Sequence, residues 1–442
     1  MPKSAPQRAN KQTLPKSAPQ RASKQTLLTE LHPSLRLRIG VGFAERFLNT
    51  MVVPLITVYL ARQVGAALAG LLLLASVLVS AVAGLAAGYL AERYGRRRAL
   101  IASAGLMTIG FATMAAGSVL PVSRAVAVLY AGYLIQTASG SFIQPVHDAV
   151  LLDVTSPDQR RLVYAFNYWS VNLALGVGAV TGTFLYAGHF TALLAGAAVV
   201  LAAATVLTFT CFAETAPPRA VSDRGSMRAM LARSYLAPLR DRGFLRVVLA
   251  MTVILGLEMQ RTSGFIGVHI ADQHRQLLLP HVPVTGIELL GIVQAANTVA
   301  IVLAAVFVER VLRGMSDAWR INVGIGLFAG CCIVLATASL AWVLLAAILL
   351  LTAGELMHIP AMQAVLARTV PDDARAGYMA VFNLNARGGA MIAALSLTAA
   401  PVLGPAGLAL AYGLLGAAAI YLYAPLVRPG PAPAREPGTI RV

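Results

Sequence analysis

Long apolar runs separated by short polar connections make up most of this sequence. A helix needs about 20 apolar residues to cross a hydrocarbon core about 30 Å thick, and twelve runs reach that length. The predicted spans cover residues 37–61, 66–90, 98–120, 125–151, 163–187, 190–212, 244–270, 285–310, 319–339, 341–367, 377–400 and 405–427. The pattern therefore predicts an all-α polytopic membrane protein with twelve transmembrane helices.

The connection between the sixth and seventh spans, residues 213–243, is rich in arginine, contains proline and is unlike any other loop. It divides the spans six and six. Several sequence features recur in the second half with offsets of 214 to 217 residues. They are Glu92-Arg93 with Glu309-Arg310, Pro145 with Pro360, Pro157-Asp158 with Pro371-Asp372, Tyr164 with Tyr378, and Phe166-Asn167 with Phe382-Asn383. Such a repeat predicts two parallel six-helix halves, residues 37–212 and 244–427, with a substrate route between them.

Bulk composition excludes other classes of protein. Hydrophobic residues make up 58% of the 442 residues, charged residues make up 12%, and the mean hydropathy is +0.72, which is not typical of a soluble domain. The net charge of +17 does not indicate nucleic-acid binding, because Lys and Arg fall mostly in the connections between apolar runs. Cys211, Cys331 and Cys332 lie within predicted spans without metal-binding spacing, so we interpret them as small core residues.

The distribution of basic residues predicts the orientation of the chain. With both termini inside, the inner segments and the span ends beside them hold 29 Lys and Arg, whereas the outer loops hold three: Arg62, Arg124 and Arg275. An excess of this kind is typical of the cytoplasmic face. We therefore predict a multi-pass protein of the inner or plasma membrane with both termini in the cytoplasm.

The first 36 residues contain a tandem duplication. Residues 2–14, PKSAPQRANKQTL, recur as residues 15–27 with Ser23 in place of Asn10. The segment is rich in Pro, Gln and Ser, has little apolar surface to bury, and is predicted to be disordered. We expect residues 1–36 to be a solvated cytoplasmic leader, with a regulatory or partner-binding role as the alternative, and residues 428–442 to be a cytoplasmic tail.

A tight, basic hairpin connects the second and third spans within Gly88–Leu100. Its charged residues are Glu92, Arg93, Arg96, Arg97 and Arg98. The segment resembles the G-x-L-a-D-r-x-G-r-k signature of the major facilitator superfamily, matched by Gly88, Leu90, Ala91, Arg93, Gly95 and Arg96, with Glu92 where Asp is usual. The resemblance implies a conformational switch that contacts the other half near the inner end of the eleventh span. Its residues would be Gly88, Glu92, Arg93, Gly95 and Arg96. The alternative is an ordinary positively charged inner loop.

Polar side chains recur at helical spacing in several spans and are expected to face the substrate route. Glu45 and Arg46 of the first span point about 100° apart, so each needs a partner on another helix. The alternative is a structural ion pair between helices. Gly178 and Gly182 of the fifth span form a G-x-x-x-G packing edge. The candidate substrate-cavity residues are Glu45, Arg46, Asn49, Gln136, Gln144, Asn167, Tyr168, Trp169, Asn172, Arg261 and His358.

Carboxylates within the spans are candidate proton-coupling groups, because a charge at mid-bilayer costs about 2.5 to 3.5 kcal/mol and needs a partner, a cavity or a task. Glu258 is three residues from Arg261, near enough for an intrahelical pair. Glu355 has no arginine within a turn of its helix and only His358 nearby, so its surroundings best allow protonation. The alternative for Glu355 is a protonated or hydrogen-bonded structural role. Asp148 and Glu258 are expected to support coupling or to bind substrate.

Four segments together resemble the twelve-helix drug:proton antiporters, especially the LmrP type. They are AERFLNTMVVPLITVYL in the first span, the basic hairpin, Pro145 to Leu173, and GELMHIP with PDDARAGYM. The resemblance covers residues 35 to 427. It implies a membrane exporter that uses inward proton flow to expel lipophilic or amphipathic compounds, with Asp153 and Glu355 as coupling carboxylates.

Two other functions remain open. A proton-coupled oligopeptide symporter also has an E-R-F sequence in its first helix, matched by Glu45-Arg46-Phe47, but Gly42 and Gln144 stand where that family has Glu and Lys. A non-transporting receptor or scaffold would leave the polar residues within the spans without a task. An enzyme is not expected, because the sequence has no phosphate loop, metal-spaced cluster or nucleophile triad. The expected partners are the lipid bilayer, a small-molecule substrate and protons, without cofactor or nucleic acid, and the protein is expected to be a monomer.

Overall fold

The computed structural model describes residues 33–153, 155, 157–212, 214, 238–279, 282–371 and 375–426. The predicted leader, central connector and tail lie wholly or largely outside these residues. The first part of the chain forms α1 (Pro33–Val64), α2 (Ala66–Tyr94), α3 (Arg96–Ser118), α4 (Val122–Asp153) and α5 (Pro157–Cys211). The second part forms α7 (Arg242–Glu258), α8 (Gln260–Ser263), α9 (Phe265–Ala271), β1 (Gln276–Leu279), β2 (Val282–Val284), α10 (Gly286–Val311), α11 (Asp317–Thr337), α12 (Ala341–Thr369), α13 (Arg375–Phe382) and α14 (Asn385–Tyr423).

The helices are long and apolar, as a membrane protein requires. Within the described residues, nine are long and apolar enough to cross a bilayer, and Ser170–Tyr186 is a shorter apolar helix. Large apolar side chains lie exposed on their outer faces, among them Val199 and Leu303, where lipid and not water is the solvent. The prediction of a polytopic all-α membrane protein is confirmed, while the number of twelve spans stays a prediction.

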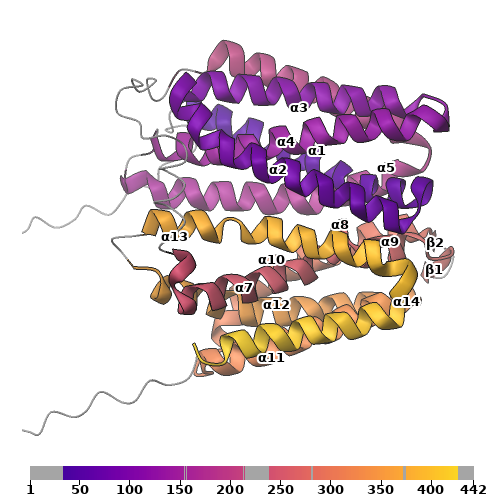
Figure 1. The fold of residues 1–442 in the computed structure, drawn as a ribbon, viewed down its shortest axis with the longest axis vertical. Helices are drawn as coiled ribbons and strands as arrows, with labels where there is room; N and C mark the ends of the chain where they lie inside the picture. Colours follow the sequence, from indigo (N-terminus) through magenta and orange to yellow (C-terminus); the bar gives the residue numbers. More distant parts are fainter. Residues whose placement is uncertain are drawn as a thin grey trace, which may run out of the picture.

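Two long helices each contain a pair of predicted spans. Gly188 has a φ of 90° within α5, and Gly404 has a φ of 61° within α14. This backbone conformation favours glycine and interrupts a right-handed helix. Both glycines fall where the sequence predicts the end of one span and the start of the next. Figure 1 shows the two parts of α14, orange and yellow, meeting at the edge of the molecule near β1 and β2.

The predicted seventh span, residues 244–270, is not one continuous helix. Helix α7 ends at Glu258, the four residues of α8 follow, and the extended Gly264 precedes α9. The buried Gln260 side chain compensates for the break: its Oε1 accepts hydrogen bonds from the Phe265 backbone N–H (3.2 Å) and the Tyr412 hydroxyl (2.9 Å). Backbone N–H and C=O groups freed by a helix break at membrane depth need such hydrogen-bond partners. The break was not predicted because hydropathy alone does not indicate where a helix breaks.

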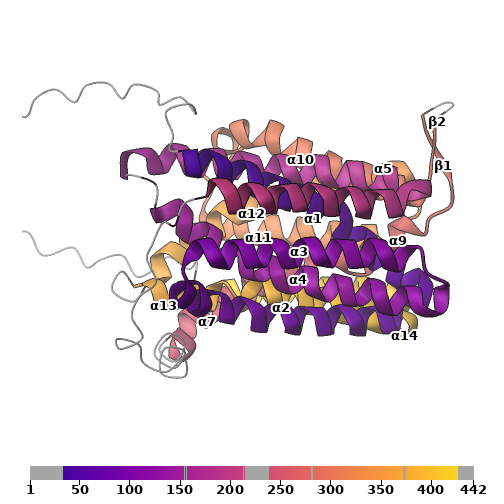
Figure 2. The same ribbon diagram turned by 90° about the horizontal axis from the view of Figure 1, so that it is seen from above.

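The helices run lengthwise between the end that carries β1 and β2 and the end that carries α13 (Figure 2). In Figure 1, α1 to α5 lie in the upper part and α7 to α14 in the lower part, with α2 packed on α14 and α5 on α10. Within the first group, a Cβ atom at Gly182 would lie 2.0 Å from the carbonyl oxygen of Met51 in α1. The predicted packing edge of Gly178 and Gly182 is therefore confirmed, because only glycine allows this approach of two helix backbones.

Candidate functional site

A cavity of about 550 Å³ lies between α1, α2 and α4 on one side and the start of α14 on the other. Its described lining residues are Asn49, Val53, Val77, Ser80, Tyr133, Gln136, Thr137, Gly140, Ser141, Gln144, Asn383, Ala386, Arg387 and Ala390. Gln136 Nε2 donates a hydrogen bond of 2.7 Å to Asn49 Oδ1, which joins α4 to α1 in the wall. Of the predicted cavity residues, Asn49, Gln136 and Gln144 line this space, whose volume is typical of sites for small organic molecules.

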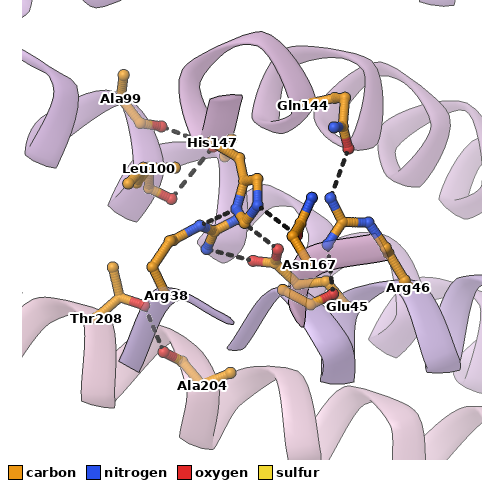
Figure 3. A network of polar contacts seen from close by, with 12 residues as sticks. Arg38, Glu45, Arg46, Ala99, Leu100, Gln144, His147, Asn167, Ala204 and Thr208 are labelled. Carbon is orange, nitrogen blue, oxygen red and sulfur yellow. Dashed lines mark hydrogen bonds and ion pairs between the residues drawn. The ribbon is translucent and has the colours of Figure 1, made fainter. Parts of the chain in front are cut away.

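A buried charged cluster lies beside this cavity, between α1, α4 and α5 (Figure 3). The Arg38 guanidinium donates to Glu45 Oε2 at 2.7 Å and to Glu45 Oε1 at 3.3 Å. Its Nε donates to His147 Nδ1 at 2.6 Å. Because Nδ1 accepts this bond, the ring proton of a neutral His147 lies on Nε2, which faces Asn167 Oδ1 at 3.4 Å. Arg38, Glu45 and His147 are all at most 6% exposed.

The expectation that Glu45 pairs with a residue of another helix is wrong. Its partner Arg38 lies on the same helix, seven residues earlier, and two helical turns bring the two side chains to one face. This spacing was available in the sequence and could have identified Arg38. Arg46 does reach another helix, since its Nη2 donates to Gln144 Oε1 at 3.3 Å.

A second buried cluster lies between α7, α10 and α12. Asn297 Nδ2 donates to Glu355 Oε2 at 3.2 Å and to Thr352 Oγ1 at 2.8 Å. The Glu258 carboxyl interacts electrostatically with Glu355 and with Arg261. The structure therefore brings together two of the predicted coupling carboxylates, from helices about 100 residues apart in sequence, next to one guanidinium. Asn297, which fixes the orientation of Glu355, was not singled out in the sequence.

The expected ion pair between Glu258 and Arg261 is not formed among the described residues. Helix α7 ends at Glu258, so the two side chains do not share the regular spacing of one helix. Arg261 Nε and Nη1 are buried without a hydrogen-bond partner. The Arg261 side chain lines a narrow space between α1, α5 and α10, where Thr50 and Gln294 are its neighbours.

The remaining candidates are distributed over the structure. His358 is fully buried: its Nδ1 lies 2.7 Å from the Gly354 carbonyl oxygen and its ring packs edge-on against Phe328, so it does not line the 550 Å³ cavity. Asn172 lines a separate groove between α5 and α10. The side chains of Gly88, Glu92, Asp148, Asp153, Tyr168 and Trp169 lie outside the part of the chain that the structure describes. The functional roles of all these residues stay predictions.

The basic hairpin is anchored by a residue that the sequence analysis missed. Gly95 has a φ of 91° and separates α2 from α3. The Glu214 carboxylate accepts hydrogen bonds from the backbone N–H groups of Arg96 (3.0 Å) and Arg97 (3.2 Å). It therefore caps the positive end of α3. Arg97 Nε also donates to the Phe212 carbonyl at 2.7 Å, so the hairpin is attached to the end of α5. Contact of the hairpin with the eleventh span stays a prediction.

An ion pair joins the two groups of helices at the end predicted to face outward. Arg62 at the end of α1 donates to Asp272 Oδ1 at 3.0 Å and to the Ala271 carbonyl at 2.9 Å, just after α9. These side chains are 40% and 50% exposed. The pair lies beside a pocket lined by Tyr59, Tyr186 and Arg275, among others. From this position we predict that the pair acts as a latch that holds this end closed.

Removing the latch is expected to shift the balance between open and closed forms of this end only modestly. Exposed ion pairs contribute about 0 to 1 kcal/mol, which corresponds to a change in population of at most about fivefold. Arg62→Gln and Asp272→Asn should each lengthen the distances between spin labels at Ala67 and His274, and the exchanged pair Arg62→Asp with Asp272→Arg should restore them. Arg275→Gln is the matched control. Unchanged distances in both single variants would show that the pair does not act as a latch.

Comparison with known proteins gives relatives over most of the chain. A family model described as Major Facilitator Superfamily matches residues 39–394. A "Na(+), Li(+), K(+)/H(+) antiporter" of Planococcus maritimus is 29% identical over 382 residues, which cover 82% of this chain and 88% of that protein. "Multidrug resistance protein MdtH" of Edwardsiella ictaluri (strain 93-146) is 28% identical over 214 residues, about half of either chain.

Solved structures match the fold. The crystal structure of an auto inhibited POT family peptide transporter has a TM-score of 0.70 at 15% identity and covers 92% of this chain and 99% of that one. A peptide transporter POT in complex with sulfate has a TM-score of 0.68 at 16% identity, covering 91% and 95%. At these identities the similarity concerns the fold alone.

Proposed function

The chain belongs to the major facilitator superfamily, and from this membership we propose that it exports amphipathic small molecules in exchange for protons. It is a multi-pass membrane transporter. In the proposed cycle, the helices before and after the central connector move against each other and expose the cavity to one side of the membrane at a time. Inward proton flow through the carboxyl groups of α7 and α12 drives the cycle.

The observation that carries this proposal is the separation of the cavity from the carboxyl groups of Glu258 and Glu355. The cavity is lined by amides, hydroxyls, apolar side chains and Arg387, whereas Glu258 and Glu355 lie in a cluster that does not line it. Substrate and proton can therefore occupy different sites, which lets the protein exchange one for the other. The named activities of the relatives, antiport and multidrug resistance, support the same mechanism.

A second candidate is the exchange of monovalent cations for protons, which the Planococcus maritimus relative favours by its name. The cavity argues for an organic substrate instead, because about 550 Å³ is far larger than one ion needs and none of its described lining residues is a carboxylate. Peptide uptake has less support, because the similarity to peptide transporters is one of fold, and Gly42 and Gln144 depart from that family's pattern.

We further propose that the protein lies in the cell membrane as a monomer, with both termini in the cytoplasm and without a bound cofactor. Labelling from outside of a cysteine introduced by Ser4→Cys or Gly438→Cys would contradict this orientation.

The test of export is transport in proteoliposomes with an imposed pH gradient. Lipophilic dyes, dipeptides and sodium are offered separately, and accumulation is measured with and without the gradient. We expect gradient-dependent movement of an amphipathic compound in the direction opposite to protons. Co-transport of dipeptides with protons, or exchange of sodium alone, would replace the proposal by one of the two alternatives.

A further inference from the structure

Helix α10 links the pocket beside the Arg62–Asp272 pair, here called the outer pocket, to the carboxyl cluster. Ile287 lines the outer pocket, Gln294 lines the narrow space at Arg261, and Asn297 holds the Glu355 carboxyl. Steps of seven and three residues keep these positions near one face of the helix, over about 15 Å of its length. The space at Arg261 therefore lies between the outer pocket and the carboxyl groups.

The two groups of helices meet closely at the level of Arg261. A Cβ atom at Gly291 of α10 would lie 1.8 Å from Thr183 Oγ1 of α5, so these two helices touch beside the arginine. The narrow space that Arg261 lines has a volume of about 10 Å³. A space of this size holds at most one water molecule. In this conformation the helices therefore leave no wide passage from the outer pocket to the carboxyl groups.

The Arg261 guanidinium places a positive charge in this constriction. The residue is 4% exposed, and its Nε and Nη1 have no hydrogen-bond partner among the described residues. The described side chains that line the space from α1, α5 and α10 are uncharged, among them Thr50, Thr183 and Gln294. The Glu258 carboxyl, on the inner side, attracts the guanidinium electrostatically.

A water molecule in the constriction could not pass protons on. Arginine N–H groups only donate hydrogen bonds, so a water beside Nε and Nη1 of Arg261 accepts from them and turns its lone pairs toward the positive charge. It then has no free lone pair with which to take up a proton from the outer pocket. A fixed guanidinium in a narrow pore also repels protons and metal cations directly.

We propose that Arg261 is an electrostatic barrier that keeps outside protons from Glu258 and Glu355 while the outer end is closed. The assignment rests on the proposed exchange function, because it requires these carboxyl groups to carry the proton. An exchanger must open its coupling group to one side of the membrane at a time. Otherwise protons cross without moving substrate. Because a guanidinium stays charged at any working pH, the barrier persists when the outside becomes acidic.

The experiment measures proton leak without substrate. Purified full-length protein is placed in proteoliposomes with choline buffers and an internal pH dye, and the decay of an imposed pH gradient is followed. Thiocyanate, a permeant anion, compensates the charge that protons move. Arg261→Gln should raise the leak about tenfold, because it removes a unit charge from the proton's route. Arg261→Lys keeps that charge and should stay within about threefold of the unmodified protein.

Arg275→Gln is the matched control. Arg275 is exposed and lines the outer pocket, outside the constriction. Its replacement removes the same charge from the same end of the protein and should leave the leak unchanged. A leak as large in this variant as in Arg261→Gln would show that the general charge of this end, and not Arg261, excludes protons.

Adding Glu355→Gln separates a leak through the carboxyl cluster from a damaged fold. Glutamine cannot take up a proton, so Arg261→Gln with Glu355→Gln should be as tight as the unmodified protein. Arg261→Gln with Glu258→Gln removes one charge of each sign and serves where Arg261→Gln alone does not fold. This charge-balanced variant should also leak, and it should become tight when Glu355→Gln is added. Monodisperse elution of each variant confirms that it is folded.

The outcomes distinguish the barrier from the export function. The barrier is overturned if neither Arg261→Gln nor the charge-balanced variant leaks, if the leak persists after Glu355→Gln, or if Arg261→Lys leaks as fast as Arg261→Gln. Gradient-driven export by the unmodified protein would be unaffected by any of these results. A leak through Glu355 in Arg261→Gln, without gradient-driven movement of any substrate by the unmodified protein, would support the barrier and contradict the export function.

Discussion

Replacing Glu355 with glutamine is expected to abolish accumulation of substrate against a gradient while preserving substrate binding and gradient-independent exchange. Glutamine resembles the protonated side chain and keeps an oxygen that can accept the bond from Asn297, which is 3.2 Å long in the structure. It cannot take up or release a proton. A gradient of 100 mV contributes about 2.3 kcal/mol per charge moved, so the variant should lose roughly fifty-fold accumulation per proton.

The cluster around Glu355 explains why Glu355, and not Glu258, is expected to exchange the coupled proton. Two carboxyl groups, Glu258 and Glu355, lie near one guanidinium, that of Arg261. One guanidinium balances one carboxylate, and the other carboxyl group needs a proton to be neutral at membrane depth. Arg261 attracts Glu258 electrostatically although the two form no ion pair, whereas Glu355 has the neutral donor Asn297 as its partner. We therefore expect Glu355 to exchange the proton and Glu258 to remain charged beside Arg261.

Glu258→Gln is the matched comparison, since it removes the other carboxyl group from the same cluster. It should reduce the rate of transport but retain a response to the pH gradient. Both variants are measured as gradient-driven uptake and as exchange in proteoliposomes over a range of pH. If Glu355→Gln still concentrates substrate with the pH profile of the unmodified protein, the coupling site lies elsewhere, and Asp148 or Asp153 becomes the better candidate.

Much of the fold could be predicted from the sequence because lipid imposes simple rules on a chain. A span must be apolar over about 20 residues, so Gly188 and Gly404, where the backbone leaves the helical conformation, lie in the predicted breaks between the fifth and sixth and between the eleventh and twelfth spans. Gly178 and Gly182 were likewise identified as a packing edge by their spacing, and they contact the backbone of α1. These features depend on local sequence alone.

The features that sequence reasoning missed depend on neighbours from distant segments. The break after Glu258 is stabilised by Gln260, whose partners include Ser396 and Tyr412. Hydropathy does not report such contacts. The partner of Glu45 was missed for a different reason: Arg38 lies near the predicted start of the first span, where a basic residue is normally interpreted as part of an inner boundary.

The candidate site likewise contains some residues that the sequence predicted and others that only the structure identifies. Asn49, Gln136 and Gln144 were predicted from polar residues at helical spacing, and all three line the cavity. Arg387 was not predicted as a cavity residue, although Asn383, four residues earlier and on the same helical face, also lines the cavity. Its position against Gly84 requires the packing of α2 on α14, which joins segments about 300 residues apart.

Replacing Arg38 with methionine is expected to destabilise the protein more than any other single change considered above. The Arg38 and Glu45 side chains are buried, and Arg38 also donates to His147. Removing one partner leaves a buried carboxylate without compensation and a histidine nitrogen without its donor, at a cost of about 3 to 5 kcal/mol. The measurement is the free energy of unfolding in mixed micelles by titration with a denaturing detergent.

The double variant Arg38→Met with Glu45→Leu provides the decisive comparison. Replacing both members of a buried pair by apolar residues of similar size is often close to neutral, so the double variant should recover most of the stability that Arg38→Met loses. Arg36→Met is the matched control, because Arg36 is exposed and lies two residues before Arg38 on α1. It should change stability by less than about 0.5 kcal/mol.

Recovery in the double variant would mean that the pair is retained for a reason other than stability. The pair lies between α1 and α4, beside the cavity. In that case the transport rate of the double variant would be the next property to measure. A double variant as unstable as Arg38→Met would instead show that the charged cluster itself holds these helices together.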